Sequence, residues 1–189
     1  MKIEKYQTGI VSLPREEGPL SGGMGSKAEF ITIKILTSEG IEGIGYAGFA
    51  SSVMVKALKE TVDALLDQII GTDPRMVEQI NSYLRNLAGV GAPAGIATRA
   101  ISGIDVALWD IKGKLASEPI HRMLGGYRDT VPTYASGFLW RNFNLERLEK
   151  TSKELVSQGF TAMKFRMGAE DSPKKEIARM ETMRNAVGE

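Results

Sequence analysis

The chain has 189 residues, of which 42% are hydrophobic and 25% charged, and its 24 basic and 23 acidic side chains leave a formal net charge of +1. This balance predicts one or two globular domains and argues against a nucleic-acid or membrane surface, so small molecules are the expected partners. Cysteine is absent, which excludes disulfides, thiolate metal sites and a cysteine nucleophile within these residues.

The N-terminal part of the chain has the pattern of a small antiparallel sheet. A first strand is expected from Lys2 to Leu13, where the charges interrupt any continuous apolar core of a secretory signal, so a cytoplasmic protein is expected. A hairpin follows, because the β-branched run from Glu29 to Thr37 leads through the turn residues 38–40 into a second run at 41–47. The Pro- and Gly-rich residues 14–26 between the first two strands predict a surface loop.

Helices are expected next. The first covers residues 54–70, a second starts at Asp73 and Pro74, and a third starts at Thr98. The third has a buried face by its spacing of three and four residues, formed by Ile101, Ile104, Leu108, Ile111 and Leu115. Gly103 and Gly113 inside this helix each cost about 1 kcal/mol relative to alanine, so another element is expected to pack closely against them.

The last third of the chain alternates between strand and helix. Strands are expected at 130–137 and 161–168, and helices at 144–159 and 172–188. Strands that alternate with helices of this length indicate parallel βα units. A closed barrel of eight such units needs about 250 residues, so the chain is expected to be truncated, the front part of a larger protein.

Three segments carry a resemblance to a known family. They are "TRAISGIDVALWDIKGKLASEPIHRMLGG" at 98–126, "VPTYASG" at 131–137 and "GFTAMKFRMG" at 159–168. Together they resemble the enolase superfamily, in its mandelate racemase and muconate lactonizing enzyme branch, and the resemblance covers the whole chain. It implies an α+β capping domain at residues 1–127, with a three-stranded antiparallel sheet plus helices. Residues 128–189 would then be the first βα units of an incomplete (β/α) TIM-type barrel.

The resemblance also implies the chemistry. Members abstract the proton α to a carboxylate, with a Mg²⁺ ion stabilising the enediolate intermediate, and they racemise, cycloisomerise or dehydrate acid sugars. Their metal is held by three carboxylates on later barrel strands, so the resemblance implies that the magnesium ligands lie beyond residue 189 and that no acidic residue of this chain is one of them. Asp105 and Asp110 are interpreted as helix-surface or domain-contact residues, and the single histidine, His121, as structural.

Lys164 and Arg166 are the candidate catalytic residues. Their spacing of two places both on one face of the expected strand, which in the family faces the barrel mouth. Lys164 matches the family's first lysine, which contacts the substrate carboxylate. Arg166 stands where members usually carry a second lysine that acts as acid or base. An arginine almost never releases its proton, so Arg166 is predicted to clamp a carboxylate or an enediolate oxygen rather than to act as a base.

The predicted function is therefore that of an acid-sugar dehydratase-like lyase. The alternatives are a racemase or epimerase, a cycloisomerase, or, in another class, a truncated fragment without catalysis of its own. The loop at 14–26 corresponds to a capping loop of the family, which makes Glu16, Glu17 and Met24 candidates for substrate binding. The expected partners are a small carboxylate substrate and, by the habit of the family, further copies of the chain in a homo-oligomer.

Overall fold

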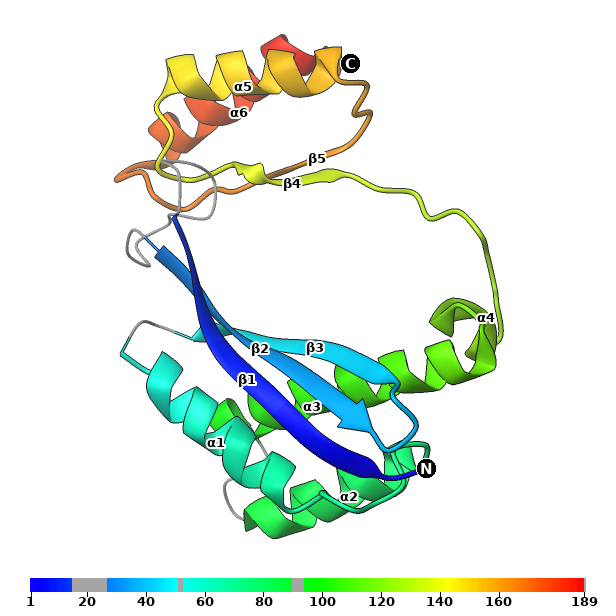
Figure 1. Cartoon of the computed structure of the whole chain (residues 1–189). Coiled ribbons are helices and arrows are strands. Elements are labelled where there is room, and N and C mark those ends of the chain that lie inside the picture. Colours follow the sequence, from blue (N-terminus) through cyan, green and yellow to red (C-terminus); the bar gives the residue numbers. More distant parts are fainter. Residues whose placement is uncertain (15–26, 51–52, 90–93, 189) are drawn as a thin grey trace. The chain divides into compact units, whose positions relative to one another are not determined.

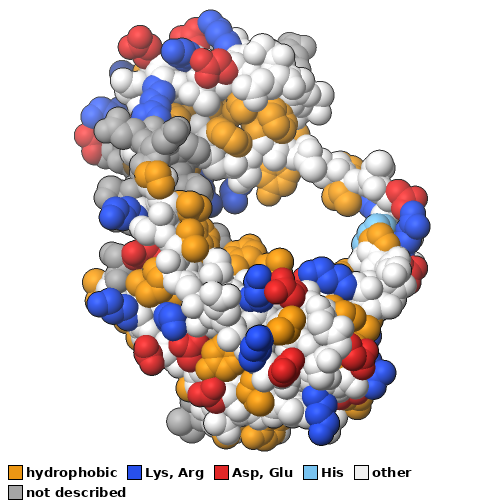
Figure 2. Space-filling model, in the orientation of Figure 1, with side chains coloured by type: hydrophobic (Ala, Val, Ile, Leu, Met, Phe, Trp, Pro, Cys, Tyr) orange, Lys and Arg blue, Asp and Glu red, His pale blue; other side chains and the backbone are white. Residues whose placement is uncertain are grey.

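The computed structural model describes residues 1–14, 27–50, 53–89 and 94–188. Its described residues form two compact units, the first made of residues 1–14 and 27–129 and the second starting at Thr130. This division lies two residues beyond the predicted boundary between residues 127 and 128. On the face drawn in Figure 2, Lys and Arg side chains of the first unit are interspersed with Asp and Glu side chains. No helix among the described residues is long and apolar enough to cross a membrane.

The first unit contains the predicted three-stranded antiparallel sheet (Figure 1). Its strands are β1 (Ile3–Pro14), β2 (Lys27–Thr37) and β3 (Glu42–Ala50), in the order β1-β2-β3. Alternate residues of β2 (Ile31, Ile33 and Ile35) are fully buried in one cluster with side chains of the helices, as the β-branched alternation indicates.

In its described residues this unit also contains the helices α1 (Val55–Asp67), α2 (Val77–Ala88), α3 (Gly95–Ala116) and the short α4 (Ile120–Met123). The predicted buried face of α3 is confirmed for four of its five residues, and Leu115 is partly buried against the same core. The predicted start of α2 at residues 73 and 74 is wrong. Asp73 instead accepts a hydrogen bond from the Arg75 amide at 3.0 Å and pairs with its guanidinium, which makes a local turn before the helix. This pairing with Arg75 lowers the pKa of Asp73 to about 2.

Strand β3 lies directly against α3, backbone to backbone, and glycines make this possible. A methyl group added at Gly45 would lie 2.2 Å from the carbonyl oxygen of Gly103, and one added at Gly43 would lie 2.2 Å from the carbonyl oxygen of Ala107. A Cβ at Gly103 would lie 2.8 Å from the side chain of Ile33. The close packing expected around Gly103 is therefore confirmed.

The second unit has the predicted order of strand, helix, strand and helix. Strand β4 (Ala135–Leu139) and strand β5 (Met163–Phe165) pair in parallel, and α5 (Leu145–Ser157) and α6 (Pro173–Val187) lie on the same side of them (Figure 1). Their core is formed by Ala135, Leu139, Leu148, Leu155 and Met183, with Met163 and Phe165 packed against it.

Both strands of this unit are shorter than the predicted ranges. Residues 130–134 are exposed and include Pro132, which has no amide hydrogen to donate, and β4 begins five residues later than predicted. The pairing register joins Ala135 to Met163 and Leu139 to Phe165, so four steps along β4 match two steps along β5. Gly137 lies within this irregularity with a φ of +90°.

Candidate active site

Lys164 and Arg166 lie on the face of β5 that is turned away from the helices. Met163 and Phe165 pack against the core formed with α5 and α6. Because side chains alternate along a strand, the intervening Lys164 and the following Arg166 are directed to the opposite face. Lys164 is exposed and Arg166 is half-buried. The strand thus presents two cations side by side on a face that α5 and α6 leave uncovered.

Arg166 is held by the end of the neighbouring strand. Its amide donates a hydrogen bond to the carbonyl oxygen of Leu139 at 2.9 Å, which extends the parallel pairing past the end of β5. Its guanidinium carbon lies 4.6 Å from the centroid of the Trp140 ring, a cation–π distance. The backbone of Arg166 therefore contacts the last residue of β4, and its side chain contacts the residue that follows.

Neither cation is neutralised by the described part of the chain. Among those residues, no carboxylate forms an ion pair with Lys164 or Arg166, and neither side chain donates a hydrogen bond. Two neighbouring cations without counter-ions create a positive potential that attracts an anion. A small carboxylate is the ligand that suits this pair, because an ammonium and a guanidinium both form charge-assisted hydrogen bonds with it.

The segment after β5 is arranged around a carboxylate of α6. One oxygen of Glu176 accepts hydrogen bonds from the amides of Gly168, Ala169 and Glu170, at 2.8, 2.9 and 3.0 Å. These bonds, of which that from Glu170 contributes most, lower the pKa of Glu176, although partial burial opposes the shift. The Glu176 carboxylate thus fixes the chain that leaves β5 directly after the candidate site.

This arrangement predicts a pH dependence of stability. The unfolded chain titrates Glu176 near its ordinary pKa of 4.5, and the folded chain titrates it lower. The stabilising contribution is therefore complete above that ordinary pKa and is lost as the pH falls through the lower, folded value. When the pH is lowered from about 5 to about 3, we expect the free energy of unfolding, measured in urea, to fall less for Glu176→Gln than for the original chain. Glu181→Gln, an exposed carboxylate of the same helix, is the control, and an equal change in both variants would contradict the assignment.

A buried arginine joins the segments that follow the two strands. Arg179 of α6 is 2% exposed, and its guanidinium donates to the carbonyl oxygens of Phe143 and, at 3.0 Å, Trp140. The same group lies 3.3 Å from a carboxylate oxygen of Glu170. Arg179 therefore connects the segment after β4 with the segment after β5 at the carboxyl ends of both strands.

The sequence analysis did not identify the three residues that support the two cations, Trp140, Glu176 and Arg179. The clearest signal was available for Arg179, which stands four residues before Met183 on the face of α6 where apolar side chains are expected. A charged residue on a buried face implies buried partners. Trp140 and Glu176 gave no signal of comparable strength, because their roles depend on the pairing register and on the path of a loop.

The other residues considered in the sequence lie elsewhere. Glu16, Glu17 and Met24 fall outside the described residues. Asp110 accepts a hydrogen bond from the amide of Ile44 at 2.8 Å and so joins α3 to β3. Asp105 accepts one from the side chain of Asn81 at 2.9 Å and so joins α3 to α2. Both aspartates make contacts within the first unit.

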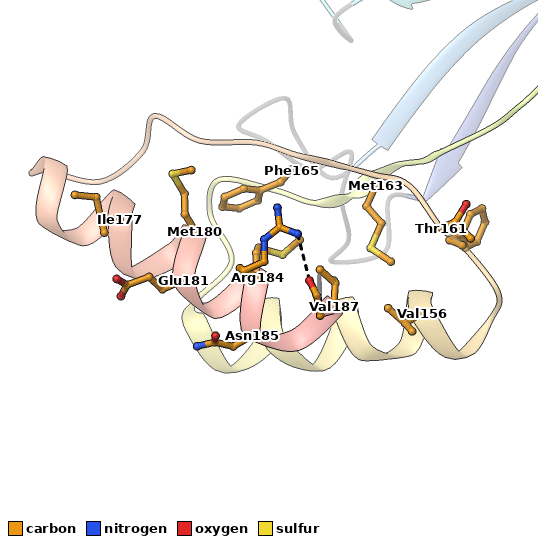
Figure 3. Close-up of a pocket in the computed structure, with 13 residues that line it drawn as sticks. Val156, Thr161, Met163, Phe165, Ile177, Met180, Glu181, Arg184, Asn185 and Val187 are labelled. Carbon is orange, nitrogen blue, oxygen red and sulfur yellow. Dashed lines mark hydrogen bonds between the residues drawn. The ribbon is translucent and has the colours of Figure 1, made fainter.

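Figure 3 shows a hollow in the second unit, and neither Lys164 nor Arg166 is among the described residues that line it. It is lined mainly by apolar side chains of β5, α5 and α6 and of the segment before β5, among them Val156, Phe160, Met163, Phe165, Ile177, Met180 and Val187. Arg184 is the one cation among the described residues that line it, and it donates a hydrogen bond to the carbonyl oxygen of Gly188 at 3.2 Å. Such a lining suits packing against another apolar element better than binding of a carboxylate.

The described residues do not form a metal site. No three carboxylate or imidazole side chains of residues 1–14, 27–50, 53–89 and 94–188 come together in a way that could hold a metal ion. The candidate site in this part of the chain is therefore a pair of cations with its supporting residues.

Comparisons with known proteins match this chain along its length. Residues 7–125 match the family model described as the mandelate racemase / muconate lactonizing enzyme N-terminal domain. A 3,6-anhydro-alpha-L-galactonate cycloisomerase from Streptomyces coelicolor is 30% identical over 99% of this chain and 52% of that protein. An arabinonate dehydratase from Saccharolobus solfataricus is 31% identical over 85% of this chain and 43% of that protein.

A solved structure agrees with these matches. The L-talarate/galactarate dehydratase from Salmonella typhimurium, crystallised with magnesium and L-lyxarohydroxamate, superposes with a TM-score of 0.87 at 25% identity. The superposition covers 99% of this chain and 49% of that one. The chain thus spans about half the length of the curated relatives that it matches.

Proposed function

This chain belongs to the mandelate racemase and muconate lactonizing enzyme family of the enolase superfamily, and we propose that the protein containing it dehydrates an acid sugar. In such a reaction the C–H bond α to the carboxylate and the C–O bond at the β carbon break. A carbon–carbon double bond forms, water leaves, and the resulting enol tautomerises to a 2-oxo acid. The names of several relatives support this reaction class, since arabinonate and talarate/galactarate dehydratases are among them.

The observation that carries the proposal is the pair of cations Lys164 and Arg166, for which the described residues supply no counter-ion. An acid sugar brings a carboxylate to this pair. A carboxylate held by two cations also withdraws charge from its α carbon, which lowers the free energy of the developing enediolate. The predicted roles are that Lys164 binds the substrate carboxylate and that Arg166 clamps a carboxylate or enediolate oxygen.

The base that takes the α proton is proposed to be another residue. A guanidinium almost never releases its proton, so an arginine at this position is a poor general acid or base. While Arg166 holds the carboxylate, a different residue, on the opposite face of the substrate, takes the α proton. A single base is enough for elimination, whereas racemisation requires proton transfer on two faces.

Magnesium is the cofactor of this proposal, and relatives such as the talarate/galactarate dehydratase were crystallised with it. When bound, the ion stabilises the negative charge of the enediolate. The described residues provide no cluster that fits it, so we place its ligands outside them. The contribution of the described residues is to bind and orient the carboxylate.

The proposal is tested by an assay on the complete protein with magnesium and a panel of aldonic and aldaric acids, in which semicarbazide traps any 2-oxo acid. Lys164→Met is expected to lower kcat/KM about 100-fold, because it removes a charged hydrogen-bond donor to the reacting carboxylate. Lys150→Met, an exposed lysine of α5, is the control and should leave the rate unchanged. Residues 1–189 alone are expected to bind the acid sugar without turnover. Dehydration by those residues alone would contradict the predicted place of the base and the metal.

Arg166→Lys separates the two possible roles of Arg166. If it is a clamp, the lysine variant should bind substrate more weakly and exchange the α proton with D₂O at an unchanged rate. A gain of exchange would instead identify this position as a base that the arginine has replaced.

A cycloisomerase is the second candidate, because the relative that matches 99% of this chain carries that name. Mass spectrometry of the product distinguishes the two, since dehydration removes water and cycloisomerisation, like racemisation or epimerisation, leaves the mass unchanged. The homo-oligomer expected from the family stays a prediction, which light scattering of the complete protein would test.

A further inference from the structure

The two cations of the candidate site differ in how they are held. Arg166 lies on the indole of Trp140, with 4.6 Å between its guanidinium carbon and the ring centroid, and its amide is paired with Leu139. Lys164 has no ring contact among the described residues. The side chain of Lys164 is therefore not restrained by a contact with the described residues, whereas the guanidinium of Arg166 is restrained by the indole ring of Trp140.

The indole of Trp140 is itself fixed before Arg166 contacts it. Its Nε1–H donates a hydrogen bond to the carbonyl oxygen of Gly137 at 2.8 Å. The backbone carbonyl oxygen of Trp140 accepts a hydrogen bond from the buried Arg179 at 3.0 Å. One bond restrains the ring and the other restrains the backbone from which it projects.

Stacking leaves the hydrogen-bonding edge of the guanidinium available. When a guanidinium stacks on an aromatic face, the ring meets the flat side of the group, and the N–H donors point outward in the plane. Among the described residues these donors have no acceptor. Two parallel N–H groups held in one plane match the two oxygens of a carboxylate.

We propose that Trp140 is a positioning residue that holds the Arg166 guanidinium flat for two-point binding of a carboxylate. The acid-sugar identity of that carboxylate rests on the proposed function, whereas the carboxylate chemistry does not. Trp140 fixes the plane of the clamp, and it reduces the side-chain freedom that Arg166 loses when the ligand binds. Trp140 acts through Arg166 and does not touch the ligand itself.

A double-mutant cycle on residues 1–189 tests this role, with galactarate binding measured by calorimetry. Trp140→Leu is expected to weaken binding about fivefold or more, and Trp140→Phe less, because a phenyl ring keeps a weaker cation–π contact. In an Arg166→Met background the same Trp140→Leu change is expected to have less than about a twofold effect. An equal loss in both backgrounds would mean that Trp140 only supports the fold, and would overturn the proposal. If the leucine variant does not fold, as judged by circular dichroism, the phenylalanine variant completes the cycle.

A second measurement separates this inference from the proposed function. Acetate is titrated into the chain, and the guanidinium ¹H–¹⁵N resonance of Arg166 is followed by NMR, with chloride at equal ionic strength as the control. A response in the original chain that is lost in Trp140→Leu supports the positioning role, even if galactarate does not bind and the acid-sugar function fails. An equal response in both chains, or no response in either, overturns the positioning role.

Discussion

Replacing Gly45 with alanine is expected to destabilise the first unit by about 3 kcal/mol or more, at the upper end of the cost of overpacking a core. The added methyl group would lie 2.2 Å from the carbonyl oxygen of Gly103 and 3.0 Å from the amide nitrogen of Ala107. Both are main-chain atoms of α3, so no rotation of a side chain can relieve the clash. Strand β3 and α3 would have to separate, and the buried face between them would lose contacts.

Urea unfolding followed by tryptophan emission measures this effect. The chain has two tryptophans, Trp109 in the first unit and Trp140 in the second. In a Trp140→Phe background the emission therefore reports on the first unit. Gly9→Ala is the matched control, because its added methyl group would meet only the hydroxyl of Thr32, at 3.3 Å, and its effect should stay within about 0.5 kcal/mol. Equal losses in both variants would contradict the role of close packing.

Arg179→Met is expected to destabilise the second unit by about 3 kcal/mol, as is usual when one partner of a buried pair is removed. The methionine fills much of the volume but removes the donor to the carbonyl oxygen of Phe143, and it leaves the carbonyl oxygen of Trp140 with the Phe143 amide as its remaining donor. It also leaves the Glu170 carboxylate without its ion pair. Arg179→Lys should recover only part of the loss, because one ammonium does not reproduce the fork of donors that meets separate acceptors.

The emission of Trp140 in a Trp109→Phe background follows the second unit in this experiment. Arg184→Met is the control, since Arg184 is an exposed residue of the same helix whose guanidinium donates to the carbonyl oxygen of Gly188. We expect its effect to stay within about 0.5 kcal/mol. If the two arginine variants unfold at the same urea concentration, Arg179 does not join the segments after the two strands as described.

The elements with strong periodicity were predicted well. The alternation of Ile31, Ile33 and Ile35 identifies a strand with one buried face, and the three-and-four spacing of α3 identifies a helix with one buried face. Both patterns arise from local geometry, which the sequence carries directly. The start of α2 was predicted wrongly, because the same Asp-Pro pair suits a helix start and a preceding turn. The contact between Asp73 and Arg75 decides between these two, and it depends on a side-chain conformation.

The site was only partly accessible from the sequence. A spacing of two is enough to place Lys164 and Arg166 on one face of a strand. The Trp140 ring beside Arg166 was not accessible, because Trp140 directly follows another strand and its position depends on the register between β4 and β5. The path of the chain around Glu176 is likewise a property of a loop, where no periodic pattern constrains the backbone.

The irregular pairing of β4 has a consequence for how related chains are compared. Because Leu139 pairs with Phe165, the residue beside Arg166 is Trp140. Regular pairing from Ala135 and Met163 onward would instead bring Phe138 beside Arg166, and a phenyl ring has no N–H with which to hold itself in place. The partner of the cation is thus selected by two additional residues and a glycine at a φ of +90°. An insertion or deletion in β4 would place a different residue beside Arg166, even if Lys164 and Arg166 stayed the same. Counting residues from the two cations in a related chain would then identify the wrong aromatic partner.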